Sequence, residues 1–598
     1  MNLGGFSGKI LFVNLSDSRI WTVPLDESMA ADYMGGLGVC IKLAADYIPP
    51  GVAPLSPENV FVLGAGPLVG TDLPSSSRIY VVSKLPASGT VGWCGAGGYT
   101  FGAQLKYAGY DHVIVTGKSE TAVYLDIEDD RVEIRDASGF RGKGIDETYD
   151  LISMDCNEPP GVLSIGPAGE NKSAIAMAFV DRISTLGRGG FGAVMGSKNL
   201  KAIVVRGTGG VRVSDRKRFN RISRLVLKSI KEYPYLKEWQ DLGMLKAFPI
   251  VPLEVYQQMK VRRTACVSCP VGCKDVIRIP EGPFSGLVKH TSSAINLFTP
   301  TMYGMKDSAE AVKLVADLDN YGLDMFEFFG LMKLACELAA AGIIRLEADE
   351  PTIDLESLDS MTAWAKKIAW RQGTAALFAD GFTAVLERIG PKAQKFAPAL
   401  IKGMQPYAGP GGVIPWDRFG TMELGQVLDP RGPHVGSGGS PTYFALRPLE
   451  AFPKNLKRMG VSDHAMDRIL GKNRDQLNVG RLLRYSHAWF SILGSLGICA
   501  RGQVNRFYNI DILSQVYEAA TGISTTVADL GNRANRAWKT LRDLNIREGL
   551  GESHEVLPAQ WFSEGGFKDY LTGKPLTIEQ AEEIKKDYFR EWGWEEND

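Results

Sequence analysis

Ala-Cys-Val-Ser-Cys-Pro-Val-Gly-Cys, residues 265–273, places three thiols in the spacing C-x-x-C-x-x-x-C. A chain that turns at Pro270 and Gly272 can aim all three sulfurs inward, as an iron–sulfur cube requires. A cubane needs four protein ligands, and the remote stretch Gly494–Cys499 offers the fourth. We therefore expect a [4Fe–4S] cluster bound by Cys266, Cys269, Cys273 and Cys499.

Two other roles for these cysteines fit the sequence less well. A structural zinc site usually pairs two C-x-x-C knuckles, or one knuckle with a His-x-x-x-His motif, and the sequence has no second knuckle. A disulfide between Cys266 and Cys269 needs an oxidising compartment or a redox role, and nothing in the sequence indicates either. The spacing thus favours the cluster over zinc and over a disulfide.

The composition is typical of a large globular protein. A chain of 598 residues is too long for one core, and 44% apolar and 23% charged residues are ordinary values. With 67 basic and 68 acidic side chains, the balance argues against nucleic-acid or anionic-membrane binding. The polar, glycine-rich start resembles no secretory signal, no apolar run is long enough to span a membrane, and eight cysteines form no disulfide framework. We therefore expect a cytoplasmic protein.

The first third of the chain is predicted to be β-rich. Apolar runs predict strands at residues 9–15, 18–23, 60–66, 78–84, 112–117, 122–127, 131–135 and 202–207. Two glycine-rich stretches, Gly92–Tyr99 and Gly187–Gly196, are expected to be loops. Neither matches a P-loop or a dinucleotide fingerprint. Together with Arg78 and Arg182 they indicate a large phosphorylated cofactor.

From residue 210 the pattern becomes helical. Helices are predicted over 216–242 and 308–341, the second broken at Asp319–Asp324, where glycine ends one helix and Asp324 can cap the next. Residues 398–453 are irregular, and such long loops usually line a site. Helical patterns resume near Ala465 and end at 578–592. The predicted fold class is α+β and multidomain: a β-rich base domain (1–208), an α-helical domain with the three-cysteine loop (209–405) and a mainly α-helical domain with Cys499 (406–598).

Several motifs together resemble those of the tungsten-containing aldehyde:ferredoxin oxidoreductases. They are Pro54–Asn59, Gly64–Leu68, Leu105–Asp111, Ile165–Asn171, Gly187–Gly190, Val194–Ala202, Asp319–Asp324 and Asp429–Gly432. The likeness is dense over 1–208, sparser to 400 and weak afterwards. It implies a β-rich base covered by two mainly helical domains. Between them it implies tungsten (or molybdenum) held by two pyranopterins, a [4Fe–4S] cluster nearby, and Mg²⁺ bridging the pterin phosphates.

The same resemblance implies roles for individual residues. It implies that the same four cysteines are the cluster ligands and that Arg78 lies between the cluster and the pterin. It also implies that Arg182 lies in the loop that contacts the phosphates and magnesium. Further pterin contacts are implied for Gly95, Ala96, Gly97, Gly98, Arg188, Gly189, Asp319, Gly322, Leu323, Asp324 and Ile498. Electrons would leave to ferredoxin or an iron–sulfur partner subunit, and we expect a homo-oligomer or hetero-oligomer.

The sequence also departs from the family pattern. The second pterin loop is normally D-x-x-G-L-C, but Gly494 stands in place of the aspartate that accepts hydrogen bonds from pterin N–H groups. Gly95 or Ala96 stands where the family has a magnesium-contacting asparagine. The metal-proximal glutamate is missing from the stretch 286–293, which contains His290. The family's metal-proximal histidine has no clear counterpart, and His434 lies nearest in sequence.

The resemblance implies oxidation of an aldehyde to a carboxylic acid, with one oxygen from water and two electrons leaving through the cluster. His290 and His434 are the candidate catalytic residues, because histidine titrates near neutral pH, whereas His487 is expected to pack on a helix. The missing glutamate keeps a second function open, since tungsten-dependent benzoyl-coenzyme A reductases share this scaffold, lack the glutamate and reduce an aromatic thioester. A third possibility is a cluster-bearing electron-transfer subunit without pterin.

Overall fold

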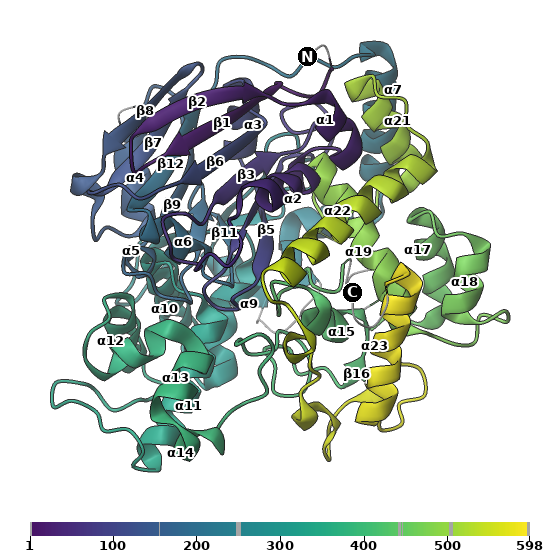
Figure 1. Cartoon of the computed structure of the whole chain (residues 1–598). Coiled ribbons are helices and arrows are strands. Elements are labelled where there is room, and N and C mark those ends of the chain that lie inside the picture. Colours follow the sequence, from purple (N-terminus) through teal and green to yellow (C-terminus); the bar gives the residue numbers. More distant parts are fainter. Residues whose placement is uncertain are drawn as a thin grey trace.

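Two six-stranded sheets dominate the N-terminal part of the computed structural model, which describes residues 3–154, 156–246, 253–439, 444, 446–501 and 506–594 (Figure 1). The first sheet has the order β2-β1-β6-β3-β4-β5. Its strands are β1 (Lys9–Asn14), β2 (Arg19–Pro24), β3 (Phe61–Ala65), β4 (Arg78–Lys84), β5 (Val91–Gly97) and β6 (His112–Thr116). The second has the order β11-β10-β9-β12-β7-β8. Its strands are β7 (Val123–Glu128), β8 (Arg131–Asp136), β9 (Gly161–Ile165), β10 (Ala178–Val180), β11 (Ser184–Leu186) and β12 (Leu200–Arg206).

The two sheets share one apolar core. Alternating side chains of β1 illustrate the arrangement, since Leu11 and Val13 join the core between the sheets while Ile10 and Phe12 pack on the other face. Helices α3 (Phe101–Tyr107) and α6 (Phe191–Ser197) contribute to the shared core. Helix α2 (Gly36–Tyr47) and helix α22 (Val527–Arg547) cover the opposite face of the first sheet. The predicted β-rich start of the chain is confirmed.

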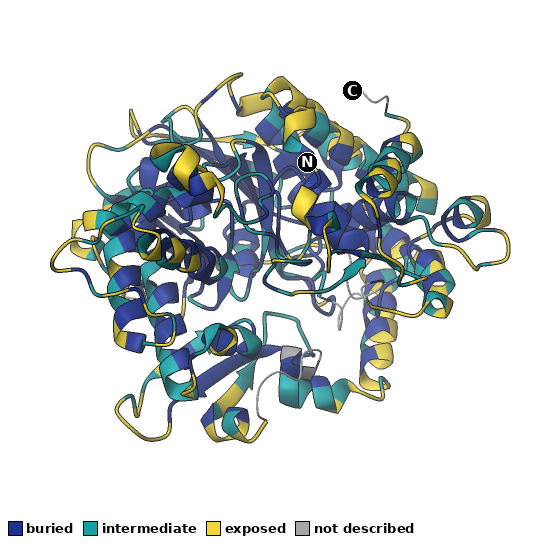
Figure 2. Ribbon diagram, turned by 90° about the horizontal axis from the view of Figure 1, so that it is seen from below, coloured by how far each residue is buried: buried dark blue, intermediate teal, exposed yellow. Residues whose placement is uncertain are grey.

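The helices after residue 210 build two further cores. One is formed around α10 (Ser308–Tyr321), α11 (Met325–Ala340), α12 (Leu358–Ala369), α13 (Gly381–Ile389) and the loops between them. The other joins α7 (Arg216–Lys231) to α17 (Phe452–Arg458), α18 (Asp463–Leu470), α19 (Val479–Leu496) and α21 (Ile510–Thr521). Helix α7, at the start of the predicted 209–405 segment, therefore contributes to the core of the C-terminal helices. Figure 2 shows the exposed residues on the outer sides of these helices.

The remaining α-helices vary from 4 to 15 residues in length. They are α1 (Glu27–Tyr33), α4 (Ile145–Met154), α5 (Pro167–Glu170), α8 (Leu236–Leu242), α9 (Leu253–Met259), α14 (Pro391–Gln394), α15 (Thr421–Leu428) and α23 (Ile578–Trp592). Within the described ranges, no helix is both long enough and apolar enough to cross a bilayer.

Three predictions about local structure are wrong. The stretch Gly187–Gly196 is predicted to be a loop, but its second half belongs to helix α6, which begins at Phe191. Gly92–Tyr99 was expected to be a loop, but most of it is strand β5, because its glycines let the strand lie against neighbouring side chains. The segment after residue 210 also contains a three-stranded sheet that the helical pattern does not predict. It consists of β13 (Lys260–Thr264), β14 (Lys274–Arg278) and β15 (Val288–Thr291), and a two-residue pair, β16 (Arg418–Phe419) with β17 (Lys568–Asp569), lies farther on.

Candidate functional site

The three-cysteine loop connects two strands of the small sheet. Strand β13 ends at Thr264 and β14 begins at Lys274, so the antiparallel pair closes the loop at its base. The backbone N–H of Val267 donates to Tyr99 O (3.0 Å), and Ser268 Oγ donates to Thr71 O (2.7 Å). These bonds tie the loop to the N-terminal sheets.

The structure brings Cys499 to this loop. Helix α19 ends in Gly497, whose φ of 84° turns the chain toward the first sheet. Ser75 then links the two segments: its N–H donates to Ser268 O (2.8 Å), and its carbonyl accepts from the N–H of Cys499 (3.0 Å). Its hydroxyl also lies 3.3 Å from Cys269 Sγ. One serine therefore fixes the distant thiol beside the local three.

The four thiols share one electrostatic environment. Burial, reinforced by the neighbouring Cys273 and Cys266 and less strongly by Cys499, raises the pKa of Cys269 to about 12. Burial would also raise the pKa of Cys273, but Arg501, Lys274 and Arg263 lower it below its usual value. Cations beside clustered thiols favour the thiolate form that metal binding requires.

The arrangement of these thiols differs from that of a site for one ion. Among the residues that the structure describes, no group of three or more His, Cys, Asp and Glu side chains is placed to hold a single metal ion. A cubane does not require such a group, because each of its four thiolates binds a different iron.

Arg78 lies at the border between the thiols and the glycine-rich strand. Its backbone N–H donates to Gly497 O (3.0 Å), and its Nη1 lies 4.0 Å from Cys499 Sγ. Its Nη2 donates to Gly95 O (2.5 Å), while its Nε is buried without a hydrogen-bond partner among the described residues. Arg78 therefore lies between Cys499 and the backbone of β5.

Glycines at the end of strand β5 let neighbouring groups lie close to the backbone beside the thiols. A Cβ on Gly97 would lie 3.3 Å from Cys266 Sγ and 3.1 Å from Lys274 Nζ, and a Cβ on Gly98, the next residue, would lie 2.1 Å from Ser77 O. Ala96 points the other way, into the core between the sheets. The end of β5 is thus packed directly against Cys266 and Lys274.

The Asp319–Asp324 motif forms the break between α10 and α11 as predicted. Gly322 ends α10 in the left-handed conformation (φ 76°), and Asp324 caps α11 by accepting from the N–H groups of Phe326 and Glu327. Leu323 is fully buried beneath the turn. Asp319 is buried and pairs with Lys289 Nζ at 3.1 Å.

Lys289 and His290 are neighbours in β15, so their side chains point to opposite faces of the small sheet. Lys289 is fully buried, near Asp319 and 3.9 Å from Asp146. His290 is partly exposed, and burial together with the charge of Arg182 lowers its pKa to about 4. At neutral pH His290 is therefore an uncharged proton acceptor.

Replacing Lys289 with methionine should destabilise the protein by about 3–5 kcal/mol, because it leaves the buried Asp319 carboxylate without its partner. Denaturant unfolding measures the change. The control is Lys237→Met, which removes the exposed Lys237–Asp241 pair and should cost at most about 1 kcal/mol. Equal effects of the two substitutions would contradict a buried ion pair at Asp319.

Arg182 lies in the turn after β10 with a φ of 50°. Its guanidinium pairs with Asp150 at 2.6 Å and stacks over the Tyr149 ring at 4.5 Å. The preceding residue, Asp181, accepts from the N–H groups of Thr100 (2.9 Å) and Val162 (2.7 Å), which fixes the turn. The turn therefore holds a partly exposed cation, as an anion-contacting residue requires.

Arg188 joins two buried carboxylates. Its Nε lies 3.5 Å from Asp324 Oδ2, and its Nη2 lies 3.5 Å from Glu327 Oε1. Nη1 donates to Gln405 O (2.7 Å). Burial, reinforced by Asp324, raises the pKa of Glu327 to about 8 although Arg188 opposes the shift. Glu327 and Gly189 line a small cavity, so this carboxyl group can exchange a proton near neutral pH.

His434 lies apart from His290, in the irregular segment that carries Asp429–Gly432. Its Nδ1 accepts from Gly436 N–H (3.0 Å), so its Nε2 carries the proton and faces Asp429 Oδ2 at 3.3 Å. Burial and the charge of Arg431 lower its pKa to about 4. His434 packs edge-on against Trp93, and Arg431 donates to Trp93 O (3.2 Å), so both residues anchor this segment to β5.

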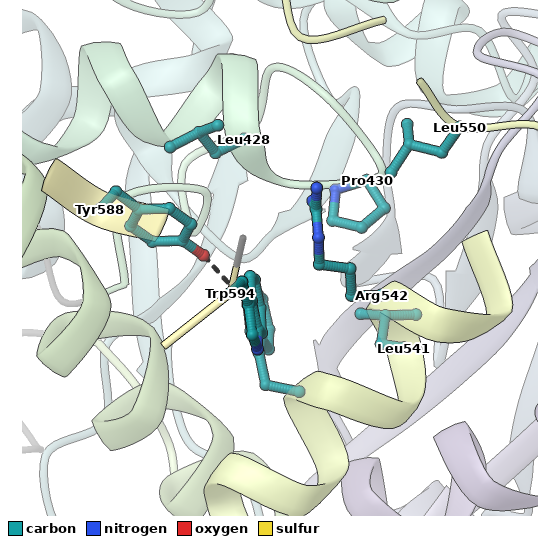
Figure 3. Close-up of a pocket in the computed structure, with 8 residues that line it drawn as sticks. Leu428, Pro430, Leu541, Arg542, Leu550, Tyr588 and Trp594 are labelled. Carbon is teal, nitrogen blue, oxygen red and sulfur yellow. Dashed lines mark hydrogen bonds between the residues drawn. The ribbon is translucent and has the colours of Figure 1, made fainter. Parts of the chain in front are cut away.

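A second small cavity lies behind the same segment (Figure 3). It is lined by Leu428, Pro430, Trp538, Leu541, Arg542, Leu550, Tyr588 and Trp594. The Tyr588 hydroxyl there accepts from Trp538 Nε1 (3.2 Å) and lies 3.0 Å from His487 Nδ1. His487 is buried on α19, as predicted, and its Nε2 contacts Ser437 O at 2.6 Å.

Sequence reasoning missed Lys289 and Glu327. Side chains alternate between the two faces of a strand, so only one of Lys289 and His290 can point inward from β15. The sequence pattern predicts no strand there, so this signal is not available from it. Glu327 follows a helix cap by three residues, where an acidic residue ordinarily satisfies the helix terminus. Its contact with Arg188 depends on a loop more than a hundred residues earlier, so no local signal reveals it.

Comparison with known proteins covers almost the whole chain. Residues 10–207 match the family described as aldehyde ferredoxin oxidoreductase, N-terminal domain, and residues 226–598 match its domains 2 and 3. The tungsten-containing aldehyde ferredoxin oxidoreductase of Pyrococcus furiosus is 30% identical over 99% of this chain and 96% of its own length. The protein of the same description from Pyrococcus horikoshii is 28% identical over 99% and 97%.

A solved structure also resembles the whole fold. It is a chain of the active site complex BamBC of benzoyl coenzyme A reductase, in complex with 1,5 dienoyl-CoA. The TM-score is 0.84 at 25% sequence identity, and the match covers 100% of this chain and 95% of that chain. The α+β, multidomain fold class predicted from the sequence is confirmed by this match and by the two family matches.

Proposed function

This chain belongs to the aldehyde ferredoxin oxidoreductase family and is an oxidoreductase, and we propose that it oxidises an aldehyde to a carboxylic acid at a tungsten (or molybdenum) bis-pyranopterin. Electrons leave through a [4Fe–4S] cluster to ferredoxin or to a partner subunit. The observation that carries the proposal is the meeting of Cys499 with the three-cysteine loop, next to Arg78 and the glycines at the end of β5.

Unpartnered buried polar atoms support a large polar ligand beside the cluster. Arg78 Nε, Tyr80 OH and Trp93 Nε1 are buried and lack a hydrogen-bond partner among the described residues. Buried polar groups are almost always hydrogen-bonded in native proteins. Two pterins rich in N–H and C=O groups fit this set, and Arg182, whose guanidinium pairs with the exposed Asp150, is the cation that would contact the phosphates and their Mg²⁺.

The reaction converts an aldehyde and one water into a carboxylic acid, two electrons and two protons. The bound cofactors supply the two-electron chemistry and the one-electron transfer that follows. We assign proton removal to Glu327, whose pKa of about 8, raised by burial and by Asp324, suits a group that accepts a proton near neutral pH. Arg188 stabilises the carboxylate as it ionises.

The first test is the metal and pterin content of the purified protein. We expect iron together with tungsten or molybdenum, and oxidation of a small aldehyde such as acetaldehyde or benzaldehyde with a viologen dye as electron acceptor. Iron without tungsten, molybdenum or pterin would instead support a pterin-free electron-transfer subunit.

We also assign a proton-relay role to His290, a neutral histidine that feels the charge of Arg182, so substituting it by alanine should slow aldehyde turnover by roughly 10–100-fold while tungsten stays bound. Steady-state kinetics and metal analysis of the same preparation measure both effects. His464→Ala changes an exposed histidine on α18 and serves as the control. Unchanged turnover in His290→Ala would assign His290 a structural role only.

A second candidate function is reduction of an aromatic acyl-coenzyme A. Two observations favour it: the whole-chain match to the benzoyl coenzyme A reductase complex, and the absence of the family's glutamate from residues 286–293. The two enzymes are distinguished by assaying one preparation with aldehydes and viologen, and with benzoyl-coenzyme A and a low-potential reductant. Activity only in the second assay would favour the reductase.

A further inference from the structure

Gly494 occupies a position where a longer side chain does not fit. A Cβ at this residue would lie 3.0 Å from Tyr80 Cζ and 3.1 Å from both Tyr80 OH and Leu37 Cδ2. The Cα–Cβ direction of Gly494 therefore points at the phenol group of Tyr80. An aspartate here and a tyrosine at position 80 would occupy the same space.

The Tyr80 hydroxyl is a buried group without an evident structural purpose. Tyr80 is fully buried in β4, and its hydroxyl has no hydrogen-bond partner among the residues that the structure describes. Leaving a buried hydroxyl unpaired costs free energy, and phenylalanine would fill the same volume without that cost. Burial raises the pKa of Tyr80 to about 12, so the hydroxyl stays neutral and can both donate and accept.

The surroundings of this hydroxyl belong to the proposed cofactor site. Arg78 lies on the same face of β4, and its guanidinium is 5.9 Å from the Tyr80 ring. Trp93 packs near the same ring, with centroids 6.3 Å apart, and its Nε1 is also unpartnered among the described residues. Ser491 lies three residues before Gly494 on α19, and its Oγ is buried and unpartnered in the described structure as well.

We propose that the Tyr80 hydroxyl replaces the missing aspartate of the second pterin loop and hydrogen-bonds the pterin there, with Gly494 providing the space. This inference rests on the proposed function, because it concerns the same cofactor. It explains why Gly494, which departs from the family pattern, lies against a buried tyrosine whose hydroxyl is unpaired among the described residues. Tyr80 is thus a positioning residue for the pterin.

The experiment compares Tyr80→Phe with the wild-type holoenzyme. We expect the fraction of tungsten and pterin retained after dialysis to fall, with dissociation about tenfold faster, while iron per chain stays unchanged. Thermal unfolding of cofactor-free protein should differ little between the two, because the hydroxyl makes no well-formed hydrogen bond to the described residues and loses only its interaction with the Arg78 guanidinium. Tyr517→Phe is the control: it removes a hydroxyl that donates to Ala30 O (3.2 Å), and should lower stability but not tungsten retention.

A second experiment changes the residues at positions 80 and 494 together. Tyr80→Ala opens the space opposite Gly494, and Tyr80→Ala combined with Gly494→Asp restores the family's aspartate in that space. The double variant should retain more tungsten and pterin than Tyr80→Ala. Unchanged retention in Tyr80→Phe, or a double variant no better than Tyr80→Ala, would overturn the role of Tyr80. Wild-type protein that holds iron but neither pterin nor tungsten would overturn the proposed function itself, and this inference with it.

Discussion

Replacing Cys499 with alanine should abolish aldehyde oxidation and strongly lower the iron content of the protein. A cubane that loses one of four thiolates is weakly held, and the structure offers Ser75 rather than another thiol beside the vacated position. Activity should fall by more than the ~10–100-fold that loss of an outer-shell partner of a metal site typically costs. Iron per chain, the visible absorbance of the cluster and dye-linked activity measure the effect.

Cys336→Ala is the matched control for this experiment. Cys336 lies on α11, is partly buried like Cys499, and directs its Sγ toward Ile353 O (4.0 Å). Its replacement should leave iron content and activity near wild type. Full iron occupancy in Cys499→Ala would reject the fourth-ligand assignment, and a similar loss in both variants would point to general instability.

Much of the fold could be predicted because local patterns determine it. The break between α10 and α11 combines a glycine that adopts φ 76° with an aspartate that caps the next helix, and both signals are visible in six residues. The final helix, Ile578–Trp592, follows its amphipathic pattern from first residue to last. The cysteine spacing likewise indicates the cluster loop without reference to the rest of the chain.

The parts that sequence reasoning missed depend on distant contacts. Strand β5 looks like a loop because of its glycines, yet it pairs with β4 along its whole length and lies against Cys266 and Lys274. The pairing of Lys289 with Asp319 joins a strand to a helix end, and that of Arg188 with Glu327 joins a loop to a helix. No local periodicity encodes such pairs. The sequence therefore points to His290 and His434 as candidate catalytic residues and not to Lys289 or Glu327.

The second large effect is expected at Glu327. Substituting it by glutamine should lower aldehyde turnover by about 10²–10⁴-fold, the usual contribution of a positioned proton acceptor, without lowering iron or tungsten content. The groups that face this carboxyl are Arg188 at 3.5 Å, Asp324 on the cap of the same helix, Tyr303, and Asp380 across the small cavity. Arg188 favours the ionised form of Glu327, and so does a hydrogen bond from the backbone of Gln405.

The pH dependence of this variant provides a sharper test than its rate. The wild-type pKa of about 8 lies above the ordinary 4.5, so the fraction of ionised Glu327, and with it the oxidation rate, should rise with pH and level off above about pH 8. Glu327→Gln should lose this rise. Because the folded state holds the proton more tightly than the unfolded state, the free energy of unfolding should fall as pH rises from about 4.5 to 8, and the variant should lose this slope too.

Glu423→Gln is the control that separates the pH dependence of turnover from the pH dependence of stability. Burial also raises the pKa of Glu423, to about 7, but its carboxylate accepts from Gly420 N–H (2.9 Å) at the start of α15. This control should therefore lose part of the pH dependence of stability while keeping the wild-type pH profile of turnover. A carboxyl group that titrates without affecting turnover takes no part in the rate-limiting proton transfer. If Glu327→Gln kept the wild-type rate and its rise toward pH 8, Glu327 would therefore not be the proton acceptor. His290 would then be the next residue to test.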